Sequence, residues 1–306
     1  MNKISLIISL FFALITLSCN SPLKKKHFVD EKKQNLNPTQ SDDYIIHDLP
    51  NELAEISGIT FIDDSIVAAI EDESGTLYFY NLGTKAIIKK QKFAKPGDYE
   101  DLVKVGADIY ITSSGGTIYK IINFASQKPV VKSYDTPFTK KNDIESLAYD
   151  KSRNCLLLAP KAQGLDSDET TKQVYAFDLK KMGIISEPVY LINLKEIEQY
   201  FKGDAITESS KKLLKAIGNE NMNKVFQPSA LTINPINKEI YILSSINNFI
   251  AVLGVNGKLK KILSYKGKVF QQPEGMAFSS NGNLYVSNEK GKKSAANIIQ
   301  ILYEKK

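Results

Sequence analysis

A short motif recurs five times along this chain, and each copy stands at the start of a strand-like run. Each copy has an apolar residue or proline, then Glu or Ser, then a short residue and an aliphatic one. The second positions are Ser57, Glu100, Glu145, Ser229 and Glu274, spaced by 43, 45, 84 and 45 residues. A repeat of about 40–50 residues that contains several strands is typical of a β-propeller. We therefore expect an all-β fold in which each copy begins one blade.

The runs that follow each copy predict blades of four strands. They are separated by turn signals such as Asn256-Gly257. The copy at Glu274 is followed by only three such runs before the sequence ends. Tyr44–Leu49 has strand character and can supply the missing outer strand. Because that pairing removes two open sheet edges, we expect a five-bladed β-propeller over residues 44–306, closed by this N-terminal strand.

The 84-residue spacing indicates two insertions in and after the third blade. One of them, Lys161–Lys172, is polar and acidic. The other spans residues 194–226, where apolar residues at helical spacing predict two short helices, the second over Lys211–Ile217. This gives a short helical insertion between blades 3 and 4. The alternative is a degenerate sixth blade, which would need strands where the sequence has Lys-rich and Glu-rich helix formers.

The N-terminal region predicts export and anchoring. Residues 1–18 resemble a lipoprotein signal peptide, with an apolar stretch too short to span a bilayer comfortably, followed by Cys19. We expect acylation of Cys19 and a bacterial envelope protein anchored in a lipid bilayer. Asn20, where Asp would favour another location, points to the outer membrane. Residues 19–43 are polar without apolar periodicity and predict a disordered tether. The alternative is an ordinary cleaved signal with an incidental cysteine.

The composition excludes several classes of function. The formal charge is +6, but Arg153 is the only arginine and tryptophan is absent. Clustered arginine favours phosphate and base recognition, so we expect no nucleic-acid partner, and we expect a monomer. The two histidines, His27 and His47, cannot form a His-rich metal site. An acylated Cys19 leaves Cys155 without a disulfide partner, and the apolar strand around Cys155 predicts a buried structural thiol.

Propeller topology places the repeated motif at one mouth of the central channel. The first strand of a blade lies innermost and successive strands alternate in direction, so the start of strand one and the end of strand two share a face. The second strands also end in polar residues, which are Glu71-Asp72, Ser113-Ser114, Lys161, Ser244-Ser245 and Asn288-Glu289. Both insertions emerge on the same face. We therefore expect this face to carry the function.

Three of the repeat positions are glutamates, and carboxylates around a narrow channel repel one another. Two unit charges about 4 Å apart cost about 4 kcal/mol at an effective dielectric of 20. Protonation, Lys161 or a bound cation can compensate. Oxygen ligands without nearby Cys or His suit Ca²⁺, so we predict a Ca²⁺ site with Glu100, Glu145 and Glu274 as metal ligands. The predicted periphery of this site comprises Ser57, Ser229, Glu71, Asp72, Asp101, Lys161, Asn288 and Glu289. The alternative is that the glutamates bond to backbone amides and hold the blades together.

The combination and order of these motifs resemble the SdiA-regulated family of bacterial propellers, although NHL-like repeat propellers share the individual motifs loosely. The segments that carry the resemblance are Glu55–Ile59, Tyr99–Leu102, Ile144–Leu147, Gln272–Phe278 and Leu284–Glu289. The resemblance covers Tyr44–Tyr303. It implies a five-bladed propeller, an envelope location and a calcium site near these glutamates, but no known reaction. The chain departs from the family pattern at Asp101 and Ser146, where Gly is commoner.

Three functions follow as hypotheses. The first is an envelope-anchored, calcium-binding propeller that acts as a binding or scaffold module for an unknown small-molecule or protein ligand on the ring face. The second is a Ca²⁺-dependent hydrolase of phosphate esters or lactones, with Glu71, Asp72 or Glu289 as base. The third is a structural repeat protein without a metal. Fold alone does not decide between them.

Overall fold

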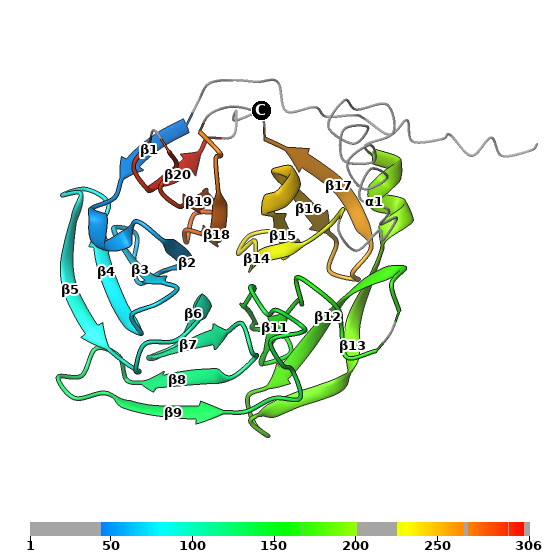
Figure 1. Ribbon diagram of the computed structural model, residues 1–306, viewed down its shortest axis with the longest axis horizontal. Coiled ribbons are helices and arrows are strands. Elements are labelled where there is room, and N and C mark those ends of the chain that lie inside the picture. The colour runs from blue at the N-terminus through cyan, green and yellow to red at the C-terminus, as the bar shows by residue number, and fades with distance from the viewer. Residues whose placement is uncertain (1–43, 167, 201–224, 266–268, 293, 303–306) are drawn as a thin grey trace, which may run out of the picture. The chain divides into compact units, whose positions relative to one another are not determined.

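The computed structural model describes residues 44–166, 168–200, 225–265, 269–292 and 294–302. The chain divides into two compact units, Met1–Leu36 and Asn37–Lys306, and every described residue belongs to the second. The predicted signal peptide, Cys19 and the tether therefore lie outside the described residues. In the second unit, five four-stranded antiparallel sheets surround a central axis and form a five-bladed β-propeller (Figure 1).

Each of the first four blades is built from consecutive strands. Blade 1 comprises β2 (Ile56–Phe61), β3 (Ile66–Glu71), β4 (Thr76–Asn81) and β5 (Ala86–Lys92). Blade 2 comprises β6 (Tyr99–Val105), β7 (Asp108–Ser113), β8 (Ile118–Ile122) and β9 (Val130–Tyr134). Blade 3 comprises β10 (Ala148–Asp150), β11 (Cys155–Leu158), β12 (Thr171–Asp178) and β13 (Gly183–Asn193). Blade 4 comprises β14 (Pro228–Ile233), β15 (Ile240–Ser244), β16 (Phe249–Leu253) and β17 (Leu259–Ser264).

Blade 5 joins the two ends of the body. It comprises β18 (Pro273–Phe278), β19 (Leu284–Asn288), β20 (Asn297–Ile301) and, as its outer strand, β1 (Tyr44–Asp48). The β1–β20 pairing is antiparallel and runs from Tyr44 opposite Ile301 to Asp48 opposite Asn297. The prediction of closure by the N-terminal strand is confirmed.

The core lies between neighbouring blades. The second strands are almost wholly buried, as β3 and β7 show. The outer strands β5 and β9 have mostly exposed residues. Between blades 1 and 2, Ile70 and Phe79 of one sheet pack with Leu102 and Ile109 of the next. Each sheet is therefore apolar on both faces, which is the pattern that a ring of packed sheets requires.

Blade 3 differs from the prediction at its first strand. We expected the strand to begin at Glu145, but β10 begins at Ala148 and only an isolated bridge joins Ile144 to Pro160. Here the Ser146 side chain, instead of a backbone ladder, forms hydrogen bonds with the neighbouring strand segment. Its hydroxyl donates to the Ala159 carbonyl and accepts from the Ala159 amide, both at 3.0 Å. This local pairing explains how the Ser146 hydroxyl is accommodated in the interior of blade 3.

The insertions are described only in part. Residues 194–200 form α1 (Leu194–Tyr200), whose Leu194 and Ile197 are buried against blades 3 and 4. The second predicted helix, Lys211–Ile217, lies outside the described residues. Short 3-10 turns occur at η1 (Asn51–Leu53) and η3 (Ser245–Asn247). Among the described residues, no helix has the length and apolarity needed to cross a membrane.

Candidate functional site

The repeated Glu/Ser position coincides with a β-bulge in four of the blades. The ladder between the first two strands shifts register across Ser57, Glu100, Ser229 and Glu274. A bulge inserts one residue that the partner strand does not match, and it re-aims that side chain. The side chains at these positions therefore do not follow the regular alternation of side chains between the two faces of the sheet.

The end of each second strand lies directly opposite these bulges. Tyr99 is paired with Ser113, and Pro273 is paired with Asn288. The innermost strands β2, β6, β14 and β18 surround the centre of the ring in Figure 1. The predicted sharing of one face by strand-one starts and strand-two ends is confirmed.

The three ring glutamates lie close enough to perturb one another. Burial raises the pKa of Glu100 to about 9, and the charges of Glu145 and Asp98 add to the shift. Burial also raises the pKa of Glu274 to about 8, with contributions from Glu145 and Glu289. Burial raises the pKa of Glu145 to about 7 against the opposing effect of Lys161. Their role as metal ligands stays a prediction.

Lys161 supplies a cation inside this group. Its Nζ lies 2.5 Å from Glu145 Oε1. Burial acts to lower the pKa of Lys161, but Glu145, Glu274 and Asp143 outweigh it and raise that pKa above the usual value. One ammonium thus faces several carboxyl groups, so protons or a further cation must balance the remaining charge.

Glu289 and Asp72 extend the acidic group on the same face. Burial raises the pKa of Glu289 to about 7, and the charges of Glu55 and Asp72 contribute. Burial likewise raises the pKa of Asp72, together with the charges of Glu73 and Glu71. These two carboxyl groups therefore belong to the site electrostatically.

Glu71 and Ser57 are used by the fold. Glu71 accepts hydrogen bonds from the Glu73 and Ser74 amides at 3.1 and 2.8 Å, which closes its own turn. Ser57 is buried where blades 5 and 1 meet, and its carbonyl accepts a 2.9 Å hydrogen bond from Ser287 Oγ. Both predicted periphery residues lie on the expected face, but these interactions are structural.

Buried oxygen atoms without hydrogen-bond partners point to a missing group. Among the described residues they include Glu145 Oε2, Asp72 Oδ1, Ser229 Oγ and Asn288 Oδ1. Ser229 and Asn288 are each only 1% exposed. A buried polar atom left unsatisfied costs about 1–3 kcal/mol, so each such atom calls for a water or an ion. All four are hard oxygen donors, which fits Ca²⁺. Within the described ranges, no group of three or more His, Cys, Asp or Glu side chains is gathered closely enough to hold a metal ion.

Asp101, predicted at the periphery of the site, has a structural role between blades. Its side chain is fully enclosed and accepts hydrogen bonds from the amides of Leu102 at 2.8 Å and Leu147 at 2.7 Å. The Leu231 amide of blade 4 also donates to it. Burial raises its pKa well above the usual value, and the amide hydrogen bonds oppose that shift. Asp101 therefore joins blades 2, 3 and 4 through their backbones.

Blade 1 makes room for this carboxylate. A Cβ atom on Gly58 would lie 2.5 Å from Asp101 Oδ1. Only glycine fits at this close approach. The glycine at position 58 of the motif therefore makes space for the Asp101 carboxyl group.

The sequence analysis missed Asp98 and Asp143, which stand two positions before Glu100 and Glu145. Asp98 is hydrogen-bonded to Glu100 and to the Ser114 hydroxyl, and it pairs with Lys140 at 3.3 Å. Burial acts to raise the pKa of Asp98, but these hydrogen bonds lower it overall. A signal existed, because every copy of the motif has an acid or amide two positions earlier. These residues are Glu55, Asp98, Asp143, Gln227 and Gln272.

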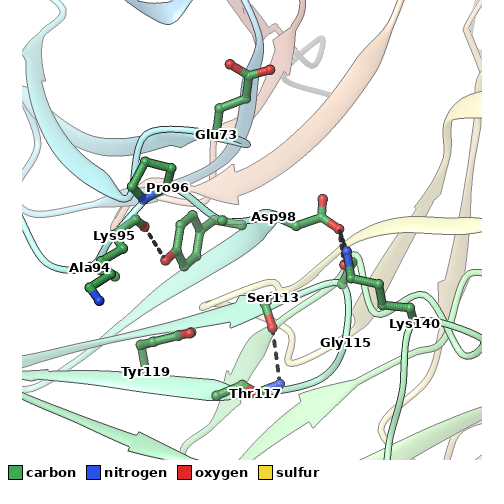
Figure 2. A pocket seen from close by; sticks show the side chains of 13 residues that line it. Glu73, Ala94, Lys95, Pro96, Asp98, Ser113, Gly115, Thr117, Tyr119 and Lys140 are labelled. Atoms are coloured by element: carbon green, nitrogen blue, oxygen red, sulfur yellow. Dashed lines mark hydrogen bonds and ion pairs between the residues drawn. The ribbon is translucent and has the colours of Figure 1, made fainter.

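A groove of about 1020 Å³ adjoins the ring between blades 1 and 2. Figure 2 shows Asp98 and Lys140 on one side, with Tyr119 and Lys95 on the other. Backbone hydrogen bonds fix its walls, since the Ser114 amide donates to the Asp98 carbonyl at 3.0 Å. Because Asp98 contacts Glu100 and also lines the groove, a molecule bound there would lie beside the ring.

The chain has distant likenesses among solved structures. None of the curated proteins matches this chain. Among solved structures, a streptogramin B lyase is 11% identical, with 84% of this chain and 97% of that chain covered and a TM-score of 0.45. A virginiamycin B lyase from Staphylococcus aureus is 12% identical, with 86% and 75% covered and a TM-score of 0.44. A chain of a mitotic checkpoint complex is 10% identical, with 97% and 99% covered and a TM-score of 0.48. Likenesses this distant carry no argument about function.

The family assignment rests on a closer match. The family model described as SdiA-regulated matches residues 44–291. This match extends from β1 into the segment after β19, and it includes all five copies of the motif. The chain belongs to the SdiA-regulated family.

Proposed function

We propose that this protein is an envelope-anchored propeller that binds Ca²⁺ in the carboxylate ring and holds a ligand on the same face. The observation that carries the proposal is the set of buried oxygens without partners, above all Ser229 Oγ and Asn288 Oδ1. They lie on the face where burial and the charge of Glu145 raise the pKa of Glu274 to about 8. A cation would satisfy the oxygens and neutralise the carboxylates together.

The donor chemistry favours Ca²⁺ over other metals. Glu100, Glu145 and Glu274, with the oxygens of Ser229 and Asn288, are the residues that would hold it. Hard oxygen donors on bulged backbone suit Ca²⁺, which accepts irregular coordination, better than Mg²⁺, which requires a near-octahedral shell. Sulfur and imidazole ligands, which favour Zn²⁺, are absent from this set.

Calorimetric titration of the chain without its signal segment, residues 20–306, should show Ca²⁺ binding. Glu274→Gln should weaken that binding by about tenfold or more, because it removes a charged ligand and keeps the side-chain shape. The matched control is Glu52→Gln, since Glu52 forms an exposed ion pair with Lys90 at 3.1 Å on the surface. Equal heats in the wild type and Glu274→Gln would contradict the ring site.

The groove beside Asp98 supports the ligand-binding part of the proposal. It combines the aromatic side chain of Tyr119 with the charged groups of Asp98 and Lys140 (Figure 2). Asp98 is also hydrogen-bonded to the ring residue Glu100. Pockets with a few convergent polar groups next to perturbed carboxyls are typical binding sites. A ligand could therefore contact the groove and the ring together.

A Ca²⁺-dependent hydrolase is the second candidate. The pKa of Glu289, about 7, places this candidate base where proton transfer is efficient at neutral pH. The metal would supply a Lewis acid that polarises a phosphoester or lactone oxygen. Turnover of such substrates that a chelator abolishes would favour the hydrolase, whereas no turnover across a broad screen would favour the binding module.

Anchoring is proposed from Cys19 and the segment before it. The wild-type chain should fractionate with membranes, and globomycin should block its processing. Cys19→Ala should move most of the protein to the soluble fraction, because a single unacylated chain has no lipid to insert. Cys155→Ala is the matched control, since Cys155 is a buried thiol of β11. Unchanged membrane association of Cys19→Ala would contradict the anchor.

A further inference from the structure

Lys161 occupies the position that a bound cation would share with the ring carboxylates. We propose that the Lys161 ammonium and the divalent cation are alternative counter-ions of the ring, so that cation binding displaces Lys161 from Glu145. Competition from Lys161 would then set the affinity of the site for the cation. The position of the Lys161 side chain on the ring face would depend on whether the cation is bound. The inference rests on the proposed Ca²⁺ site.

The position of Lys161 is equivalent to positions that carry oxygen groups in other blades. In blades 2, 3 and 5, a residue shortly after strand two donates its amide to a carbonyl of the preceding link, as the Ser114 amide does to Asp98 at 3.0 Å. The Lys161 amide donates to Asp143 at 2.8 Å, and the Glu289 amide donates to Gln272 at 3.0 Å. Where blade 5 has a carboxylate, blade 3 thus has an ammonium. The ring therefore contains its own cation at a place where blades 2 and 5 have the oxygen groups of Ser114 and Glu289.

The backbone at Lys161 is held firmly. Lys172 is only 1% exposed, and its Nζ donates to the carbonyls of Lys161 at 2.8 Å and Ala162 at 2.6 Å. The Ala162 amide also donates to the Asn142 carbonyl at 3.1 Å. Displacement therefore requires rotation of the Lys161 side chain alone. That side chain is 27% exposed, so it has a path to solvent.

The contacts of Glu145 make the two cations compete. Its Oε1 atom is occupied by Lys161 Nζ at 2.5 Å, and its Oε2 atom is buried without a partner. A divalent ion that binds this carboxylate would lie within a few ångströms of the ammonium. Repulsion between the two is strong at the effective dielectric of a partly buried site. The ammonium therefore leaves, or the metal binds weakly.

The first test compares Ca²⁺ titrations of three forms of residues 20–306. Lys161→Met should bind Ca²⁺ about tenfold or more tightly than the wild type, because the competing charge is gone. Lys120→Met is the matched control, since Lys120 forms a partly buried ion pair with Asp108 at 3.0 Å in blade 2. Its affinity should stay within about threefold of the wild type, because its charge lies in an ion pair of its own.

The second test uses the unmodified sequence and so does not depend on a variant that folds. An amine-acylating reagent and mass spectrometry measure the labelling of Lys161 with and without Ca²⁺. Labelling should rise several-fold with Ca²⁺, whereas buried Lys172 should remain weakly labelled in both conditions.

The outcomes separate this inference from the proposed function. Wild-type binding of Ca²⁺, with neither tighter binding by Lys161→Met nor a change in Lys161 labelling, overturns the competition and leaves the metal site intact. No Ca²⁺ binding by the wild type or by Lys161→Met overturns both. Binding by Lys161→Met alone supports the inference and shows that Lys161 is the resident cation of the native ring.

Discussion

Asp101→Asn should lower the free energy of unfolding by about 1–3 kcal/mol, because it leaves a buried backbone amide without an acceptor. Asp101 accepts from the amides of Leu102, Leu147 and Leu231, which belong to three blades. An asparagine of the same shape would present an NH₂ group to at least one of these donors. A buried amide would then be left without an acceptor.

Urea denaturation of residues 20–306, followed by circular dichroism, measures this effect. Asp64→Asn is the control, because Asp64 is exposed and accepts a single hydrogen bond from Ser280 Oγ at 2.6 Å. We expect a change within about 0.5 kcal/mol for the control. A loss of less than about 1 kcal/mol in Asp101→Asn would show that the three blades do not depend on this carboxylate.

The neighbouring positions Glu100 and Asp101 divide two tasks between them. The bulge at Glu100 takes that side chain out of the ladder, and Asp101 fixes the backbone immediately after it. The sequence suggested, as an alternative, that the ring glutamates bond to backbone amides and hold the blades together. Asp101, the residue after Glu100, makes such bonds. A variant of Asp101 that still folds would move Glu100 and so disturb the ring.

The fold was predictable because it depends on periodic features. The motif period gave the number of blades, and strand alternation placed strand-one starts and strand-two ends on one face. The unit at Glu274 has three strand-like runs instead of four, and the spare strand at Tyr44 implied closure, which the β1–β20 pairing confirms. Each of these features follows from chain geometry that every propeller of this kind shares.

The details of the site were less predictable because they depend on single residues in tertiary contact. A bulge shifts the alternation by one residue, and the sequence does not mark where it occurs. Asp101 and Ser146 looked like departures from a pattern, yet each forms hydrogen bonds with partners far along the chain, Leu147 and Ala159 among them. Asp98 and Asp143 belong to a sequence pattern two positions before the motif, but the groups that they contact are fixed only when neighbouring blades meet.

Without Ca²⁺, the midpoint of thermal unfolding should fall by about 5 °C between pH 6.5 and pH 8. Burial and mutual repulsion raise the pKa values of Glu100 to about 9, Glu274 to about 8, and Glu145 to about 7. The unfolded chain loses these protons near pH 4.5, whereas the folded ring retains them to higher pH. A raised carboxyl pKa means that folded stability is greatest at low pH and is lost as the pH rises through the folded pKa values.

The chosen window isolates the ring from two opposing groups. Burial lowers the pKa of His47, which affects stability below about pH 6.5, and burial lowers the pKa of Lys172 to about 8, which acts above that value. Differential scanning fluorimetry in a chelator measures the profile. Glu100→Gln/Glu274→Gln should make the fall shallower, and the part that remains is due to Glu145 and Glu289, whose pKa values are about 7. Ca²⁺ binds the ionised ring, so it should raise the midpoint more at pH 8 than at pH 6.5. A flat chelator profile in the wild type would mean that these carboxyls are ionised in the fold without a cation. The charge imbalance on which the proposed Ca²⁺ site depends would then not exist.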